Sequence, residues 1–255
     1  MFRTGLVSVT FRKQTPAAVV NLAKAAGLQG IEWGGDVHVP PGDPIKAREV
    51  YQMTIDAGLA VAAYGSYHRI GCAPDGTGEF QKVLESAVEL QAPTIRVWAG
   101  NVASRDADRG WWDRVSDESR RIADLAGTAG ISISYEYHRN TLTDTNETAI
   151  RLLQEVGHGN VRTYWQPLAE LDRRARAEGL GMVGSRLTNL HVFHWINGIR
   201  APLQAGADEW LEYLKLAAGT GDHYALLEFV MNDDEDQFRR DADTLRTLIR
   251  RLHKE

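Results

Sequence analysis

The chain has 255 residues, of which 43% are hydrophobic and 25% charged, and its formal net charge is −5. This composition is ordinary for a soluble globular protein, and the acidic balance disfavours a broad nucleic-acid-binding surface. No apolar run approaches the roughly 18 residues that a membrane span requires. The single cysteine, Cys72, excludes an internal disulfide, and the first residues read as a strand rather than a signal peptide, so we expect a cytoplasmic protein.

Short runs rich in β-branched and aromatic residues alternate along the chain with longer amphipathic runs, which indicates repeated strand–helix units. Helix starts are marked by Thr15–Pro16 and Asp43–Pro44, each an N-cap residue followed by a proline. In chain order, the predicted strands and helices are 3–10 and 16–26, 30–34 and 44–57, 60–67 and 78–91, 94–99 and 111–129, 131–137 and 145–156, 161–166 and 168–178, 187–193 and 207–219, and 223–230 and 235–252.

Eight such pairs in a chain of this length predict one α/β domain over residues 1–255, a single (β/α)8 barrel. A doubly wound open sheet is the alternative. No GxGxxG motif follows the first predicted strand, which removes the main reason to prefer an open dinucleotide-binding fold.

Polar residues alternate with apolar residues on several of these strands. In ISISYEY (131–137), the large apolar residues share one face, while Ser132, Ser134 and Glu136 share the other. Because helices should cover the apolar face, the polar face should line the barrel interior. The same parity directs a further set of side chains inward, namely Glu32, Arg96, Trp98, His191 and Glu228.

Four polar residues stand at the ends of the last four strands: Glu136, Gln166, His191 and Glu228, at spacings of 30, 25 and 37 residues. The C-terminal ends of barrel strands meet at one mouth, where active sites are built. Two carboxylates, an imidazole and an amide oxygen there suit a divalent cation. A solvated strand-end glutamate is the alternative for each residue alone, but burying several carboxylates together requires a cation or another partner.

These residues, with the segments IEWGGDVHVP, YGSY, IRVWAG and YEYHRNTLTDT, resemble the xylose isomerase-like TIM barrel superfamily, in particular its sugar phosphate isomerase/epimerase group, over essentially the whole chain. The resemblance implies one divalent cation (Mn2+, Mg2+, Co2+ or Zn2+), with Glu136 and Glu228 as ligands and proton-transfer groups and His191 as a ligand. The family usually has Asp on the sixth strand and His three residues later, where this chain has Gln166 and Ala169. A glutamine brings no negative charge, so metal affinity should fall.

The resemblance also implies a small carbohydrate substrate and an isomerase or epimerase that removes a proton next to a carbonyl and passes through an enediolate. A sugar or inositol dehydratase on the same fold needs the same proton abstraction. A non-catalytic carbohydrate-binding barrel would explain the altered positions 166 and 169. An apurinic-site endonuclease would need more metal ligands than the predicted interior offers. A homo-oligomer is compatible with all of these functions.

Further candidates for substrate contact lie at the strand ends and in the loops that follow them: Glu32, His38, His68, Arg96, Trp98, His138, His194 and Arg200. Each has a structural alternative. Arg96 and Glu32 could form an ion pair inside the barrel, and the histidines could be ordinary loop residues. Trp98 and Trp195 could offer a wall to a sugar ring or simply pack. Arg200 could hold an anionic group or remain solvated.

Overall fold

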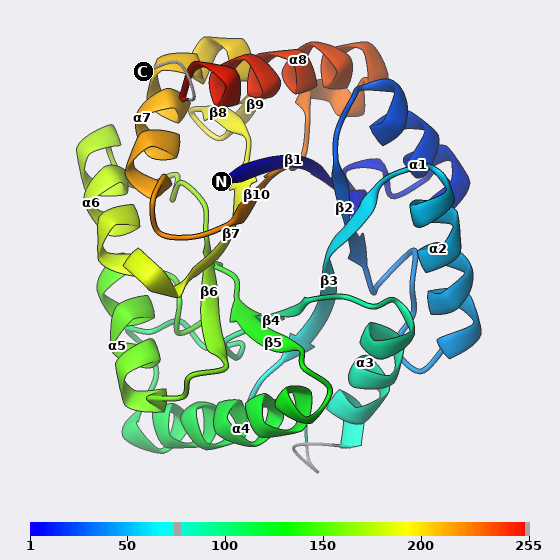
Figure 1. The fold of residues 1–255 in the computed structure, drawn as a ribbon. Helices are drawn as coiled ribbons and strands as arrows, with labels where there is room; N and C mark the ends of the chain where they lie inside the picture. Colours follow the sequence, from blue (N-terminus) through cyan, green and yellow to red (C-terminus); the bar gives the residue numbers. More distant parts are fainter. Residues whose placement is uncertain (74–77, 253–255) are drawn as a thin grey trace.

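The computed structural model describes residues 1–73 and 78–252, which form a closed barrel of eight parallel strands surrounded by eight α-helices (Figure 1). This confirms the predicted (β/α)8 architecture. The barrel strands are β1 (Phe2–Val7), β2 (Gly30–Gly34), β3 (Ala60–Arg69), β4 (Thr94–Trp98), β5 (Ser132–Tyr135), β6 (Val161–Trp165), β7 (Leu187–Val192) and β10 (His223–Leu227). Each strand pairs with its neighbour in sequence, and the barrel closes where Gly5 of β1 lies opposite Leu226 of β10.

The helices follow their strands and lie on the outside of the barrel: α1 (Pro16–Ala25), α2 (Pro44–Asp56), α3 (Gly78–Glu89), α4 (Arg109–Thr128), α5 (Asn146–Val156), α6 (Arg173–Val183), α7 (Ala207–Ala217) and α8 (Glu235–Leu252). The predicted caps form: the Thr15 side chain accepts a hydrogen bond from the Ala18 amide, and Asp43 accepts one from the Lys46 amide.

The core has two layers. Most buried apolar side chains fill the space between the strands and the helices, and Trp33, Trp165 and Trp210 are the largest of them. A smaller group, which includes Val7, Tyr164 and Leu226, fills the barrel interior. Trp165 and Tyr164 therefore face opposite sides of β6, as the alternation of side chains along a strand requires. None of the helices in the described part of the chain is long and apolar enough to cross a membrane.

Several predicted boundaries differ from the structure. The first strand ends at Val7, not at residue 10, because Ser8–Phe11 forms the 3₁₀ helix η1. The predicted helix 168–178 lies at 173–183, because the Asp172 side chain caps it by accepting a hydrogen bond from the Ala175 amide. The short hairpin β8 (His194–Ile196) and β9 (Ile199–Ala201) was not predicted. Its Asn197–Gly198 turn, with both φ angles positive, is the sequence signal that would have revealed it.

Candidate metal centre

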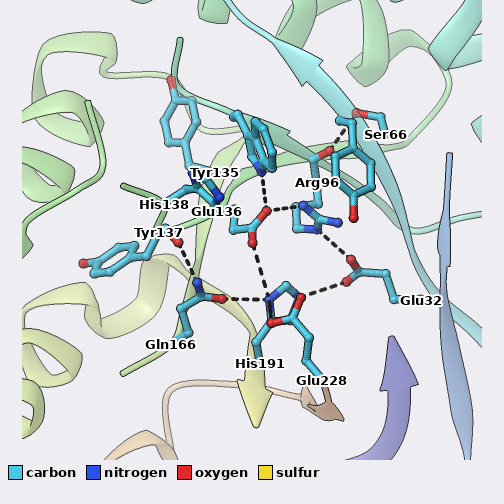
Figure 2. A network of polar contacts seen from close by, with 12 residues as sticks. Glu32, Ser66, Arg96, Tyr135, Glu136, Tyr137, His138, Gln166, His191 and Glu228 are labelled. Atoms are coloured by element: carbon cyan, nitrogen blue, oxygen red, sulfur yellow. Dashed lines mark hydrogen bonds and ion pairs between the residues drawn. The ribbon is translucent and has the colours of Figure 1, made fainter. Parts of the chain in front are cut away.

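Glu136, His191 and Glu228 come together inside the C-terminal mouth of the barrel (Figure 2). All three are buried, and each offers a ligand atom that lies within 4.8 Å of the others. His191 Nδ1 is 3.4 Å from Glu228 Oε2 and 3.9 Å from Glu136 Oε1. Three strands far apart in sequence thus direct their terminal polar side chains to one point.

The two glutamates occupy the first position beyond their strands. The Glu136 amide donates to the Val97 carbonyl at 3.0 Å, and the Glu228 amide donates to the Val192 carbonyl at 3.0 Å. These bonds extend the parallel hydrogen-bond pattern by one residue, and they determine that both side chains point to the interior face of the sheet. The backbone turns away immediately after Glu228, since Phe229 has φ of 54°. The carboxylates therefore stand at the rim of a rigid sheet.

Gln166 joins the group from the end of β6. Its Oε1 lies 2.9 Å from His191 Nδ1, and its Nε2 donates to the Tyr137 carbonyl at 2.7 Å. The hydrogen bond to Tyr137 settles which end of the amide faces the histidine, because only the NH2 end can donate. The amide oxygen is therefore turned toward the same point as the two carboxylates.

Arg96 lies beneath the three residues as a buried counter-charge, between Glu32 and Glu136. Its Nε donates to Glu32 Oε1 at 2.6 Å, and its Nη1 donates to Glu136 Oε2. The indole Nε1 of Trp98 also donates to Glu136 Oε2. Two donors thus hold one oxygen of Glu136 and leave Oε1 facing His191. Arg96 is 1% exposed and Glu32 is fully buried, so both the predicted ion pair and the predicted inward direction are present.

Glu32 also contacts the far side of the His191 ring, where its Oε2 lies 3.5 Å from Nε2. A carboxylate behind a ligating histidine commonly orients the ring and fixes the nitrogen that faces a metal. Here that arrangement directs Nδ1 toward Gln166, Glu136 and Glu228.

Acidic groups outnumber basic groups in this pocket. Glu32, Glu136 and Glu228 face one arginine, Arg96, and one histidine, His191. Burial raises the pKa of Glu228 to about 7, and repulsion from Glu136 and Glu32 adds to it against the attraction of His191 and Arg96. Burial would also raise the pKa of Glu32, but Arg96 and His191 outweigh it and lower that pKa to about 2. Burial disfavours charged His191, yet the surrounding carboxylates raise its pKa.

This donor set fits a divalent cation. Ligand atoms about 2.0 to 2.4 Å from one ion lie at most about 4 to 4.8 Å apart, and the atoms of Glu136, His191 and Glu228 lie within 4.8 Å of one another. In the deprotonated form that ligation requires, with Glu228 ionised and His191 neutral, Arg96 offsets one of the three carboxylates, and the remaining two negative charges match a dication. Gln166 Oε1 stands close enough to His191 Nδ1 to share the ion as a neutral ligand.

His138 and Trp98 lie beside this group. The His138 ring stacks on the indole of Trp98 with centroids 4.2 Å apart, and its Nδ1 donates to the Arg139 carbonyl at 2.7 Å. The Arg69 guanidinium also lies over Trp98, 4.0 Å from the ring centroid. At these distances one face of an indole cannot hold both groups, so His138 and Arg69 cover opposite faces. Trp98 is thus packed rather than open to a sugar ring.

Two of the predicted loop histidines turn away from the mouth. His68 Nε2 lies 3.2 Å from Glu118 of α4, in the layer between strands and helices. His38 bonds to the Ser8 hydroxyl at 2.9 Å and to the Gln14 carbonyl at 3.1 Å, and it is 3% exposed. Neither ring contacts the groups around His191. Both had the spacing of site residues, and only their partners, far away in sequence, reveal their direction.

The candidates after β7 lie on or beside the hairpin. His194 Nδ1 is 3.9 Å from Glu209 of α7. Arg200 pairs with Asp233, and its guanidinium lies 4.8 Å from the centroid of the Phe229 ring. Trp195 is 36% exposed. The structure therefore brings Glu32, Arg96, Trp98 and His138 to the four central residues, but not His38, His68, His194 or Arg200.

Sequence reasoning did not single out Tyr67 and Arg69, at the end of β3. The Tyr67 ring lies 5.0 Å from the Arg96 guanidinium and edge-on to Trp98. Its backbone has φ of 58°, which is rare for a residue with a side chain. The pairing of β3 with β4 is irregular between Gly65 and Arg69. This irregularity changes the side-chain parity and has no clear sequence signal.

Comparisons with known proteins identify the family and the fold. The xylose isomerase-like TIM barrel family model matches residues 20–248. A 3-dehydroshikimate dehydratase of Bacillus anthracis is 27% identical over 170 residues, which are 62% of this chain and 59% of that protein, so less than two thirds of the relative is spanned.

Among solved structures, the probable 3-DHS dehydratase involved in petrobactin synthesis from Bacillus anthracis has a TM-score of 0.81 at 20% identity and covers 96% of this chain and 98% of its own. A D-psicose 3-epimerase with D-tagatose from Clostridium cellulolyticum H10 has a TM-score of 0.73 at 17% identity, covering 98% and 99%. A xylose isomerase-like TIM barrel protein from Mycobacterium smegmatis in complex with magnesium scores 0.77 at 16% identity, covering 98% and 97%. These likenesses show the shared fold. Because the family model spans most of the sequence, the chain belongs to the xylose isomerase-like TIM barrel family.

Proposed function

We propose that this protein is a divalent-metal-dependent enzyme that isomerises or epimerises a small carbohydrate by moving a proton next to a carbonyl group. The observation that carries the proposal is the buried meeting of Glu136, His191 and Glu228 at the barrel mouth, with ligand atoms within 4.8 Å. A cation held there would act as a Lewis acid toward charge that develops on substrate oxygens. The epimerase and dehydratase names among the structural neighbours support this class of chemistry.

From their hydrogen bonds we infer different roles for the two glutamates. Glu136 Oε2 accepts from both Arg96 and Trp98, and these two donors hold the carboxylate in place. Among the described residues, Glu228 forms an ion pair with His191 alone, at 3.4 Å. It is therefore the less restrained carboxylate. We assign proton removal to Glu228. Glu136 would ligate the cation and return a proton to the substrate from β5, which requires that it enter that step in its protonated form.

A dehydratase is the second candidate, because the curated relative that matches this sequence is a 3-dehydroshikimate dehydratase. Loss of water requires the same proton abstraction and, in addition, an acid for the departing hydroxyl. His138, which stacks on Trp98 beside Glu136, is our candidate for that role, and it would have to act in its doubly protonated imidazolium form. Product analysis separates the two reactions, since only the dehydratase releases a product lighter by one water.

The test is solvent deuterium incorporation into a panel of sugars, sugar phosphates and polyhydroxylated acids, with Mn2+ present and bound metal measured in parallel. Glu228→Gln keeps an oxygen for the cation but removes the base, so exchange should fall by about 10² to 10⁴ while metal stays bound. Glu209→Gln removes a carboxylate of α7 from outside the mouth and should leave exchange unchanged. Parent-level exchange in metal-loaded Glu228→Gln would refute the assigned role. A parent protein that neither binds metal nor exchanges protons would refute the proposed function.

A further inference from the structure

Three arginines at the barrel mouth form ion pairs with acidic residues of neighbouring elements, namely Arg12, Arg96 and Arg200. Arg69, at the end of β3, differs from them in its contacts. Within residues 1–73 and 78–252 it contacts no carboxylate at ion-pair distance; its contacts are the Trp98 indole and the Gly100 carbonyl, 3.4 Å from Nη1. The Arg69 guanidinium is thus not held in a direct ion pair by any of the described carboxylates.

The Arg69 guanidinium is held in a fixed orientation rather than free in solvent. The side chain is half-buried, and its guanidinium carbon lies 4.0 Å from the centroid of the Trp98 ring. Stacking uses the face of a guanidinium and leaves the N–H groups along its edge available for carboxylate or phosphate oxygens. A partly desolvated cation without a direct ion pair is unfavourable, so an anion bound to Arg69 would offset the cost of burying the charge.

Trp98 links this guanidinium to the candidate metal centre. Its indole N–H donates to Glu136, and its opposite face carries the His138 ring. Because the Nδ1 proton of His138 is donated to the Arg139 carbonyl, Nε2 remains available to a ligand. Arg69, Trp98 and His138 therefore form one stacked unit on the same side of the mouth as Glu136.

We infer that Arg69 forms an anion subsite beside the metal centre, and that the substrate carries a carboxylate or phosphate group besides its hydroxyls. This inference rests on the proposed function and names the class of its substrate. The charge of the whole chain, −5, opposes the approach of an anion. A local arginine that forms no ion pair within the described part of the chain supplies an attraction for an anion at this point.

Matched substrates test the subsite by activity. Deuterium exchange is measured for neutral sugars, their phosphate esters and their carboxylic acids, so that the phosphate and carboxylate arms identify the anion. Arg69→Gln should raise KM for the anionic substrates by about 10- to 100-fold, the range expected for lost hydrogen bonds to a charged group, and leave kcat nearly unchanged. Neutral sugars should not respond to this change.

Arg114→Gln is the matched control, because Arg114 is an exposed arginine of α4 that lies over Trp111 rather than Trp98. It removes the same charge from the protein without touching the stacked unit, and it should leave KM unchanged. Equal effects of the two variants would mean general electrostatic attraction and would overturn the subsite. Neutral sugars that turn over as well as anionic ones, with no response to Arg69→Gln, would overturn it while leaving the proposed function intact.

A binding measurement tests the subsite without turnover. Isothermal titration with inorganic phosphate, in the presence of Mg2+, should show binding to the parent and to Arg114→Gln, and at least tenfold weaker binding to Arg69→Gln. Phosphate held by the cation alone would be insensitive to Arg69→Gln, and that result would overturn the inference. Failure of every sugar to exchange, together with Arg69-dependent phosphate binding, would refute the proposed reaction and retain the anion subsite.

Discussion

The buried Arg96 offers the sharpest test of how the site is held together. Arg96 is 1% exposed and lies between Glu32 and Glu136, which are 0% and 5% exposed. Arg96→Met preserves most of the side-chain volume but leaves two buried carboxylates without their counter-charge. Breaking a buried ion pair from one side costs about 3 to 5 kcal/mol. For a chain of this size each kcal/mol shifts the melting temperature by about 2 to 4 °C, so the variant should melt about 6 to 20 °C lower.

Urea and thermal unfolding measure this change, and two variants control for it. Arg48→Met removes an exposed ion pair with Glu89, 2.9 Å long, and should change stability little because solvent screens it. The double variant Glu32→Met with Arg96→Met removes both charges of one pair, so it should be more stable than Arg96→Met alone. Mn2+ should stabilise Arg96→Met more than the parent, because a cation would replace the missing positive charge next to Glu136.

A loss no larger than that of Arg48→Met would refute the reasoning. It would mean that the carboxylates at the mouth take up protons or water instead of relying on Arg96. A double variant less stable than Arg96→Met alone would contradict the idea that an uncompensated charge, rather than lost packing, causes the damage.

Three further outcomes follow from the structure. Gln166→Asp should tighten Mn2+ binding in titrations, because it adds a charge to a hard-cation site; equal or weaker affinity would mean that Gln166 is not a ligand. Gly65→Ala should destabilise the fold by roughly 1 to 3 kcal/mol in urea unfolding and weaken metal binding, since its Cβ would lie 2.6 Å from Arg96 Nη2. Gly159→Ala, with no atom within 4 Å of its Cβ, is the control and should cost little. Burial lowers the pKa of His38 below 6.5. The unfolded chain therefore takes up a proton at His38 before the folded protein does, and stability should fall as pH drops below about 6.5. His38→Gln should flatten this pH dependence in melting curves between pH 7 and 5, and an unchanged slope would contradict the prediction.

The architecture and the inward set of polar residues could be predicted from the sequence because both depend on local periodicity. Eight alternating strand and helix patterns leave few topologies besides a closed barrel. Within a strand the side-chain period is two, so the position of Glu136 between Tyr135 and Tyr137 already determines that it faces the interior once the barrel closes. The same rule places Arg96, His191 and Glu228 inward, and the structure shows them in contact.

Beyond the strand ends that periodicity stops, and only the tertiary structure decides where a side chain points. His68 was a reasonable candidate by position. In the structure it bonds to Glu118, fifty residues later in the chain, and lies in the layer between the strands and the helices. Arg69 follows the irregular end of β3, and its role depends on Trp98 of the next strand. A loop side chain takes the direction in which it finds a hydrogen-bond or stacking partner. Those partners come from distant parts of the sequence, so no local pattern encodes them.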